Sequence, residues 1–437
     1  MTSCIQKVFS FPVCKRRHVQ ASFTGGSVSS DGGVVLLRQV DRRLHLTEQL
    51  ARALPDARRQ ASCEHTQREL LRQRVYSLCL GYEDLNDQLT LRQDAALQTA
   101  AETDAPLAHP STLCRWENAA DRQTAWLVHE IFLKQFIASF AAPPTELVLD
   151  FDATDDPVHG QQEGRFFHGY YDAYCFLPLY VFCGDRLLVA YLRPSNRDVA
   201  RHAWAILALL VKRLRQAWPR VRIVVRGDSG FCRWRMLRWC ERHEVGYVIG
   251  LAKNARINEL ARPLIEQASQ WHSATGHKQR LFGQVAYAAA SWDRPRRVIV
   301  KAEHTEGGSN PRYVVTNLEG APQPLYDQLY CARGEMENRI KEQQLALFAD
   351  RTSAHRWWAN QFRLLLSALA YTLMEALRRL GCAGTEWAQA QCDTLRLRLL
   401  KIGTVVMRNT RRVRLLWSSS YPSQEVFAQV VARVASG

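Results

Sequence analysis

Several carboxylates follow a short apolar run near the middle of the chain. The run 147–149 is typical of a buried strand, and Asp150, Asp152, Asp155 and Asp156 come directly after it. Because successive side chains of a strand point to opposite faces, Asp150 and Asp152 share a face. Buried strands rarely carry two aspartates without a use for the charge, and carboxylate oxygens suit Mg²⁺. The other interpretation is a strand that ends in a polar turn. Asp155, Asp156 and Glu163 are expected to be solvated turn residues in either case.

Two further acids stand at positions that favour the same chemistry. Asp228 ends a second apolar run, 222–227, and Glu337 lies in a polar segment that we predict to be a long helix, 326–350. In an open α/β sheet, sites gather where strands end, so the aspartates of the two runs are expected to converge. Two cations about 4 Å apart, bridged by carboxylates, activate water or a 3′-hydroxyl for attack on a phosphodiester.

These residues carry a resemblance to a known family. The segment Tyr330-x2-Arg333-x3-Glu337 resembles the Y-x2-R-x3-E-x6-K signature of bacterial insertion-sequence DDE transposases. Together with other motifs it looks like the insertion-sequence-1380 family, over nearly the whole chain from residue 23 onward. The resemblance implies a ribonuclease-H-like core with a β insertion between the second and third acids. The other motifs are Asp152-x-Thr154, Arg226-Gly227-Asp228-Ser229-Gly230-Phe231 and His168-Gly169-Tyr170-Tyr171-Asp172.

The resemblance also implies the roles of the acids. Asp152, Asp228 and Glu337 would ligate two Mg²⁺ ions, for which Mn²⁺ can substitute, and would carry out DNA strand cleavage and transfer. The Asp-x-Thr pattern favours Asp152 as the first acid, with Asp150 as the alternative. Arg333 would bind a phosphate in bidentate fashion. The alternative interpretation is that the helix carrying Arg333 only exposes an ordinary salt-bridged face to solvent.

The chain departs from the signature at Gln344, where the family pattern has Lys. At about 100° per residue, Tyr330, Arg333, Glu337 and Gln344 fall on one stripe of an α-helix. Lys341 lies within about 40° of that stripe and can supply the missing cation.

An aromatic residue of the insertion is a further candidate for DNA contact. Trp292 is expected either to stack on an unpaired base near the cleaved end or, as most tryptophans do, to pack in a core.

The order of apolar runs predicts an α/β fold with a mixed sheet. An antiparallel meander (147–149, 174–183 and 186–193) is extended by crossover units that carry helices 199–218 and 233–243 and strands 222–228 and 247–251. We therefore expect four regions. They are a mainly helical DNA-binding region (1–140), the catalytic core (141–251 and 326–380), a mainly β insertion (252–325) and a basic C-terminal region with a hairpin and a last helix (381–437).

The N-terminal region is rich in arginine at helical spacing. A helix over 67–80 has apolar residues on one side and Arg68, Arg72 and Arg74 on the side expected to face outward. Such a segment ahead of a catalytic core is either a DNA-binding module or a solvated helical face. A basic arm (Lys15-Arg16-Arg17-His18) precedes it.

Composition narrows the class of protein and its partner. The 437 residues carry a net charge of +16, which predicts a polyanionic partner, most often nucleic acid. Twelve scattered cysteines without a Cys-x-x-Cys pair indicate free thiols in a reducing compartment. We find no signal-peptide pattern and no membrane-length apolar run, so a cytoplasmic, nucleoid-associated bacterial protein is expected.

The combined prediction is a DNA transposase. It would act on double-stranded DNA, both the terminal inverted repeats of its element and the target, as a homodimer. The alternatives are a ribonuclease-H-like nuclease that cuts without joining, and a non-catalytic DNA-binding protein derived from a transposase.

Overall fold

Strand β4 (Glu146–Ala153) lies in the middle of a large mixed sheet. Leu147, Leu149 and Phe151 point into one apolar core, so Asp150 and Asp152 share the opposite face of the strand, as their spacing predicts. The structure is a computed structural model and describes residues 7–435.

The sheet has nine strands and contains the predicted meander and crossovers. β8 pairs antiparallel with β4 and with β9, whereas β10 runs parallel to both β4 and β11. Gly184, with a positive φ of 58°, makes the predicted hairpin between β8 and β9. The strand order is β12-β13-β15-β11-β10-β4-β8-β9, with bounds β8 Leu179–Cys183, β9 Arg186–Tyr191, β10 Arg222–Gly227, β11 Gly246–Leu251, β12 Gln279–Tyr287, β13 Arg296–Thr305 and β15 Arg312–Thr316, while β14 (Gly308–Ser309) pairs with β13.

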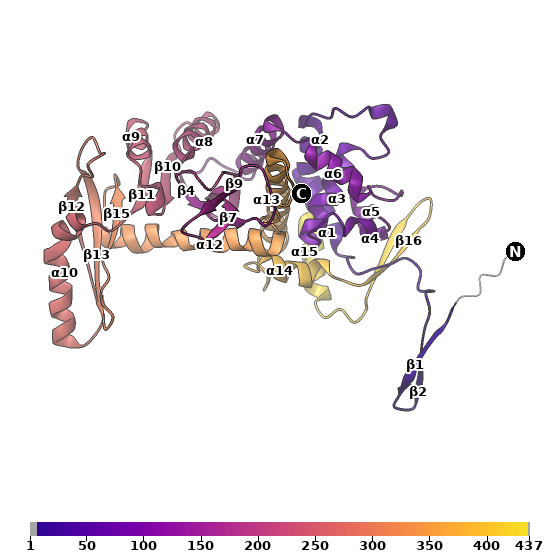
Figure 1. Ribbon diagram of the computed structural model, residues 1–437. Helices are drawn as coiled ribbons and strands as arrows, with labels where there is room; N and C mark the ends of the chain where they lie inside the picture. Colours follow the sequence, from indigo (N-terminus) through magenta and orange to yellow (C-terminus); the bar gives the residue numbers. More distant parts are fainter. Residues whose placement is uncertain (1–6, 436–437) are drawn as a thin grey trace. The chain divides into compact units, whose positions relative to one another are not determined.

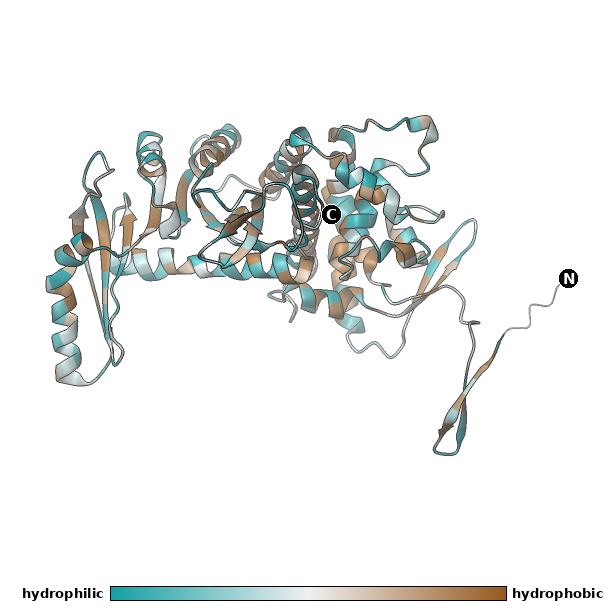
Figure 2. Cartoon of the chain, in the orientation of Figure 1, coloured by the Kyte–Doolittle hydropathy of each residue, from teal (hydrophilic) through white to brown (hydrophobic). Residues whose placement is uncertain are grey.

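Four helices pack on the apolar face of this sheet (Figure 1). Their buried residues join those of the strands in one continuous core, and Figure 2 shows apolar residues in both the strands and the helices. Helical periodicity predicts α8 and α9 within a few residues of their ends. The helices are α7 (Arg122–Ala138), α8 (Ala203–Ala217), α9 (Trp234–Arg242) and α10 (Ala255–Thr275).

Region 252–325 differs from the mainly β insertion expected from the sequence. It begins with the long helix α10, capped by Asn254, whose Oδ1 accepts the amide of Ile257. Its strands do not form a separate sheet, because β15 pairs with β11 and continues the core sheet outward to β13 and β12. Pro263 inside α10 obscures the helical periodicity at the level of sequence.

An irregular helical run covers part of the opposite face of the sheet. Tyr326 packs with Val248, Ile299 and Val314 in a smaller apolar cluster. The predicted long helix is therefore present over 322–346, but it is not a uniform α-helix. It is made of α11 (Pro322–Pro324), a π-helix (Leu325–Tyr330), a 3₁₀ turn (Cys331–Arg333), α12 (Gly334–Lys341) and a second π-helix (Glu342–Ala346).

The described chain divides into two compact units. The sheet unit comprises 120–345 and 349–368. The helical unit comprises the described residues up to 119, residues 346–348 and those from 369 onward. The long helix α13 (Trp357–Gly381) contributes to both units.

The helical unit combines N-terminal helices with C-terminal strands. Strand β3 pairs with β16, and β16 with β17, which confirms the predicted C-terminal hairpin. The bounds are α1 Val34–Leu44, α2 Leu46–Ala53, α3 Gln67–Leu80, α4 Gln88–Leu91, α5 Ala95–Ala101, α6 Pro110–Asn118, β3 Val28–Ser29, β16 Thr404–Arg408, β17 Val413–Trp417, α14 Cys392–Leu395, α15 Gln424–Ala435 and the hairpin β1 (Phe9–Cys14) with β2 (Arg17–Ala21).

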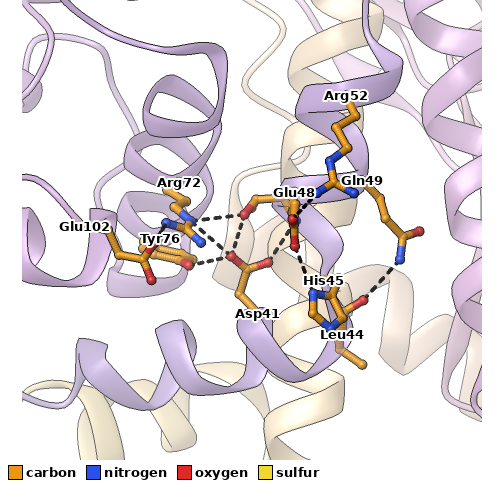
Figure 3. A network of polar contacts seen from close by, with 10 residues as sticks. Asp41, Leu44, His45, Glu48, Gln49, Arg52, Arg72, Tyr76 and Glu102 are labelled. Carbon is orange, nitrogen blue, oxygen red and sulfur yellow. Dashed lines mark hydrogen bonds and ion pairs between the residues drawn. The ribbon is translucent and has the colours of Figure 1, made fainter.

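The expectation that the arginines of α3 face outward is wrong for two of them. Arg72 and Arg74 are buried. Arg72 donates to Glu102 at 2.6 Å and to Asp41, which also accepts from Tyr76 (Figure 3). Arg74 likewise pairs with the buried Glu117. These guanidinium groups hold the helices of the unit together, so they are not available to DNA.

The described cysteines are free, and no helix within residues 7–435 is both long enough and apolar enough to cross a membrane.

Candidate active site

The parallel pairing of β4 with β10 brings two of the predicted acids to the same end of the sheet. Gly227 lies opposite Phe151 in this register, so the next residues along each strand, Asp228 and Asp152, are level with one another. Asp228 begins a short 3₁₀ turn, and its Oδ1 accepts the amide of Gly230 at 2.9 Å. This turn directs the chain away from the sheet immediately after the acid.

The third acid reaches the same place from the helical run. The Arg333 guanidinium donates through one nitrogen to Asp152 at 2.9 Å and through the other to Glu337 at 2.6 Å. Arg333 and Glu337 are four residues apart, which places them on one helical face. The arginine therefore connects the first acid on β4 with the third acid on α12.

Burial raises the pKa of Asp152 to about 6, from an ordinary value of 3.8. The guanidinium of Arg333 opposes this rise, whereas the negative charges of Asp228 and Glu337 add to it. Three carboxylates are thus close enough for their charges to interact, and a cation would relieve their mutual repulsion.

Asp150, the alternative first acid, has a different environment. It is buried and forms a bidentate ion pair with Arg226, the residue opposite it on β10, with a distance of 2.7 Å between Arg226 Nη2 and Asp150 Oδ2. Arg226 also donates to the carbonyl of Leu329 at 2.6 Å. Both Asp150 oxygens are occupied, and the pair links two strands to the helical run.

Tyr330 lies beside the second acid. Its hydroxyl would stand 2.7 Å from a Cβ placed on Gly250, and the backbone of Asp228 and Ser229 lies on the same side of that glycine. Burial raises the pKa of Tyr330, while nearby Arg333 lowers it and Asp228 raises it. The absence of a side chain at Gly250 lets the tyrosine and the turn after β10 approach each other.

The prediction that Gln344 and Lys341 lie on or near the stripe of Glu337 assumed a regular α-helix, which the structure does not have here. The π-helix that starts at Glu342 turns less per residue than an α-helix, so the α-helical angle does not apply between Glu337 and Gln344. Gln344 Nε2 donates to the carbonyl of Asp155 at 3.0 Å, in the loop that follows the first acid. Lys341 is exposed and forms no ion pair with any residue in 7–435.

Trp292 is half-buried in the turn between β12 and β13. Its ring packs edge-on against Tyr287 at 5.5 Å, and the Arg296 guanidinium lies 5.3 Å from its centre. The side chain packs against the core of the sheet unit.

Asp156 is buried, contrary to the solvated turn considered from the sequence. One of its oxygens accepts from the Thr352 hydroxyl at 2.9 Å, and the other has no hydrogen-bond partner among the described residues. Burial raises its pKa well above the ordinary value. Nothing local in the sequence signals this, because Thr352 lies far along the chain.

The donor set is of the kind that divalent cations prefer. Asp152, Asp228 and Glu337 offer only carboxylate oxygens, and the side chain of the first of them is largely buried. Within residues 7–435, however, no three such side chains are close enough together to hold a metal ion as they stand, since Arg333 occupies the space between two of them. The three carboxylates are ligands of the type that binds a divalent cation. In this structure the guanidinium of Arg333 balances part of their negative charge.

Comparison with known proteins identifies the class. Residues 11–436 match the family model described as "Transposase DDE domain group 1". A search of curated proteins finds no match. Among solved structures, the chain is similar to a piggyBac transposase in a synaptic complex with hairpin DNA, at 10% identity and a TM-score of 0.44, over 84% of this chain and 78% of that one.

Since the family model covers almost the whole chain, the protein belongs to the group 1 DDE-domain transposases. It is an enzyme of DNA transposition, which cleaves DNA and transfers the cut strand. Enzymes of this class use divalent metal ions.

Proposed function

We propose that Asp152, Asp228 and Glu337 are the catalytic acids with which this transposase cuts its element ends and joins them to target DNA. The observation that carries the proposal is the bridge from Arg333 to Asp152 and Glu337, beside a strand register that brings Asp228 level with Asp152. Asp150 is assigned a structural role, because Arg226 occupies both of its oxygens.

These acids would hold two Mg²⁺ ions, or Mn²⁺ in their place. Such ions lower the pKa of the attacking hydroxyl and stabilise the leaving oxygen of a phosphodiester. Arg333 would help to position the scissile phosphate, because its planar set of N–H donors matches phosphate oxygens. Tyr330, fixed beside Asp228, and Lys341, exposed on α12, would add further contacts to the DNA backbone.

We further propose a ribonuclease-H-like core of the kind that the sequence resemblance implies. Support comes from the strand order β9-β8-β4-β10-β11. In this order β8 is antiparallel to both β9 and β4, and β10 and β11 are parallel to β4. Membership of the insertion-sequence-1380 family is also proposed. Its support is the motif set at Asp152, Asp228 and Glu337 and the resemblance along the chain.

The proposed partners are the terminal inverted repeats of the element and a target duplex, bound by a homodimer at the bacterial nucleoid in the cytoplasm. A net charge of +16 favours phosphate contacts, and exposed Arg411, Arg412 and Arg414 on the β16–β17 hairpin are candidates for them. Residues 1–140 are proposed to hold the main DNA-binding region, although Arg72 and Arg74 are excluded from direct contact. Trp292 stays a candidate for base stacking.

An assay with purified protein tests the proposal. The protein is incubated with Mg²⁺, a fragment that carries the inverted repeats flanking its gene, and a supercoiled plasmid as target. We expect joined products from the wild type, and only a shifted band from Glu337→Gln. A fragment with scrambled repeats should be neither cut nor joined. Cut but unjoined ends would instead indicate a nuclease. Binding without cutting by the wild type would contradict the assignment.

A further inference from the structure

A small hairpin next to the candidate active site exposes an unusual number of aromatic rings. It is formed by β6 (Phe166–His168) and β7 (Ala173–Phe176), and we call it the aromatic hairpin. The exposed fraction is 52% for Phe167, 48% for Tyr174 and 85% for Tyr170. Single exposed aromatics are common on protein surfaces, but three within eight residues form a local apolar patch.

The pairing of the two strands puts two of these rings on a common outer face. Phe167 lies opposite Tyr174, with ring centres 5.6 Å apart and edge-to-face packing. The Arg165 guanidinium lies 4.5 Å from the centre of the Tyr174 ring. Cys175, which alternates with Tyr174, is fully buried, so the other face of β7 packs against the protein. The outer face is thus an aromatic surface that carries a positive charge.

The aromatic hairpin is fastened to the segment that follows the first acid. Strand β5 (Asp156–Pro157) pairs with β7, and the amide of Val158 donates to the carbonyl of Tyr174 at 2.9 Å. Tyr171, in the turn of the hairpin, feels the negative charges of Asp155 and Asp152, which add to the effect of burial in raising its pKa to about 12. The hairpin therefore lies beside the carboxylates of the candidate active site.

Positive charge lies along a neighbouring loop. The Ser195 hydroxyl donates to the carbonyl of Phe166 at 2.9 Å, which joins the hairpin to the segment after β9. Arg197 and Arg201 in this segment are exposed, and neither forms an ion pair with any described residue. Asp172 lies in the turn of the hairpin, and Asp198, in the same segment as the two arginines, pairs with Arg233.

We propose that the aromatic hairpin stacks on unpaired bases of the DNA strand at the cleavage site. Aromatic rings beside arginines form a surface typical of single-strand binding, in which rings stack on bases and guanidinium groups hold phosphates. Only the location at a cleavage site rests on the proposed function, since binding of single-stranded DNA is independent of catalysis. The arginines beside the aromatic rings favour nucleic acid as the ligand of this surface. Because every base can stack on an aromatic ring, we expect little dependence on base sequence.

The test is a metal-free binding measurement on the full chain. The first probe is an oligothymidylate of about 15 nucleotides with one central 2-aminopurine, a base whose fluorescence falls on stacking. The second is the same sequence in a fully paired duplex. We expect Phe167→Ala, Tyr170→Ala and Tyr174→Ala each to weaken single-strand binding about five- to 100-fold and to restore part of the fluorescence. Duplex binding should change less than about twofold.

Conservative and matched variants complete the design. Tyr170→Phe and Tyr174→Phe should keep wild-type binding, because stacking needs the ring and not the hydroxyl. Trp271→Ala removes an aromatic side chain on α10 that is 47% exposed, and it should have no effect. Weaker binding of both probes alike, or unchanged binding of both, overturns the proposal. The binding measurement contains no metal and no cleavage step, so a failure of the catalytic assignment leaves its outcome unchanged, and the two failures are distinguishable.

Discussion

Opposing electrostatic effects meet at the carboxylate of Asp152. Burial and the charges of Asp228 and Glu337 favour its protonated form, whereas Arg333 favours its ionised form. A metal ligand must be ionised, so a proton competes with the cation for this side chain.

The first prediction is a pH dependence with a defined direction. Because the pKa of Asp152 is raised to about 6, lowering the pH through that value protonates the ligand, and the cleavage rate should fall. A higher Mg²⁺ concentration should move the midpoint of this fall to lower pH, since the cation competes with the proton. Arg333→Gln should move the midpoint upward. Single-turnover rates between about pH 5 and 8 measure it, and a rate that is flat over this range would contradict the prediction.

The second prediction concerns the lysine missing from the signature. If Lys341 positions a phosphate, Lys341→Ala should slow cleavage without lowering the thermal unfolding temperature, because an exposed helix position tolerates alanine. Gln344→Lys should restore part of the rate in the double variant. The two carboxylates that could form an ion pair with Lys341 have other partners, because Glu337 pairs with Arg333 and Glu342 pairs with Arg339. Wild-type cleavage by Lys341→Ala would assign the role to Gln344 or to a residue elsewhere.

The candidate acids can be predicted from the sequence, but the side chains with which they pair cannot. Alternation along β4 is enough to put Asp150 and Asp152 on one face. The distinction between them depends on Arg226, which lies 76 positions from Asp150 and reaches it only through the parallel pairing of β10. No local pattern contains that information.

The helical run from 322 to 346 departs from α-geometry on both sides of α12. Single π-turns are often found at functional sites, and here they flank the segment that carries Arg333 and Glu337. The first π-helix ends at Tyr330, whose hydroxyl approaches Gly250 on β11.

Gly250 therefore provides the third prediction. A Cβ at this position would lie 2.7 Å from the Tyr330 hydroxyl and 2.9 Å from the amide of Ser229, so Gly250→Ala must displace the tyrosine or the turn that follows Asp228. We expect cleavage to fall at least about tenfold, since small misplacements in an active site are costly. Gly334→Ala is the control, because nothing lies within 4 Å of its added Cβ. Equal cleavage by the two variants would mean that this close approach is unimportant.

Strands of the core are easier to predict than the region after β11. The runs that become β4, β10 and β11 are short, apolar and bounded by polar turns, which is typical of buried strands. Helix α10 contains a proline and lies among Gly, Pro and Asn residues, so its apolar spacing is less apparent. Arg72 and Arg74 follow the pattern of an exposed face, but their acidic partners come from other helices.

For the whole molecule, net charge determines how binding depends on salt. With a charge of +16, we expect the logarithm of the DNA affinity to fall linearly with the logarithm of the salt concentration. Replacing exposed Arg411 and Arg412 by Ala should reduce the slope by about one for each phosphate that the variant no longer binds. Fluorescence anisotropy between about 50 and 200 mM salt measures this. An affinity that stays constant over that range would point to a partner other than DNA.

The most direct test of the central claim compares the three proposed catalytic acids with Asp150, the acid that pairs with Arg226. Cleavage is measured under single-turnover conditions, together with DNA binding and thermal unfolding. Asp152→Asn, Asp228→Asn and Glu337→Gln should each lose at least about a thousandfold in rate and keep their binding and stability. The double variant Asp150→Asn with Arg226→Gln replaces the buried ion pair by amides and should cut within about tenfold of wild type. Loss of cleavage in that stable double variant, with activity retained in Asp152→Asn, would contradict the assignment.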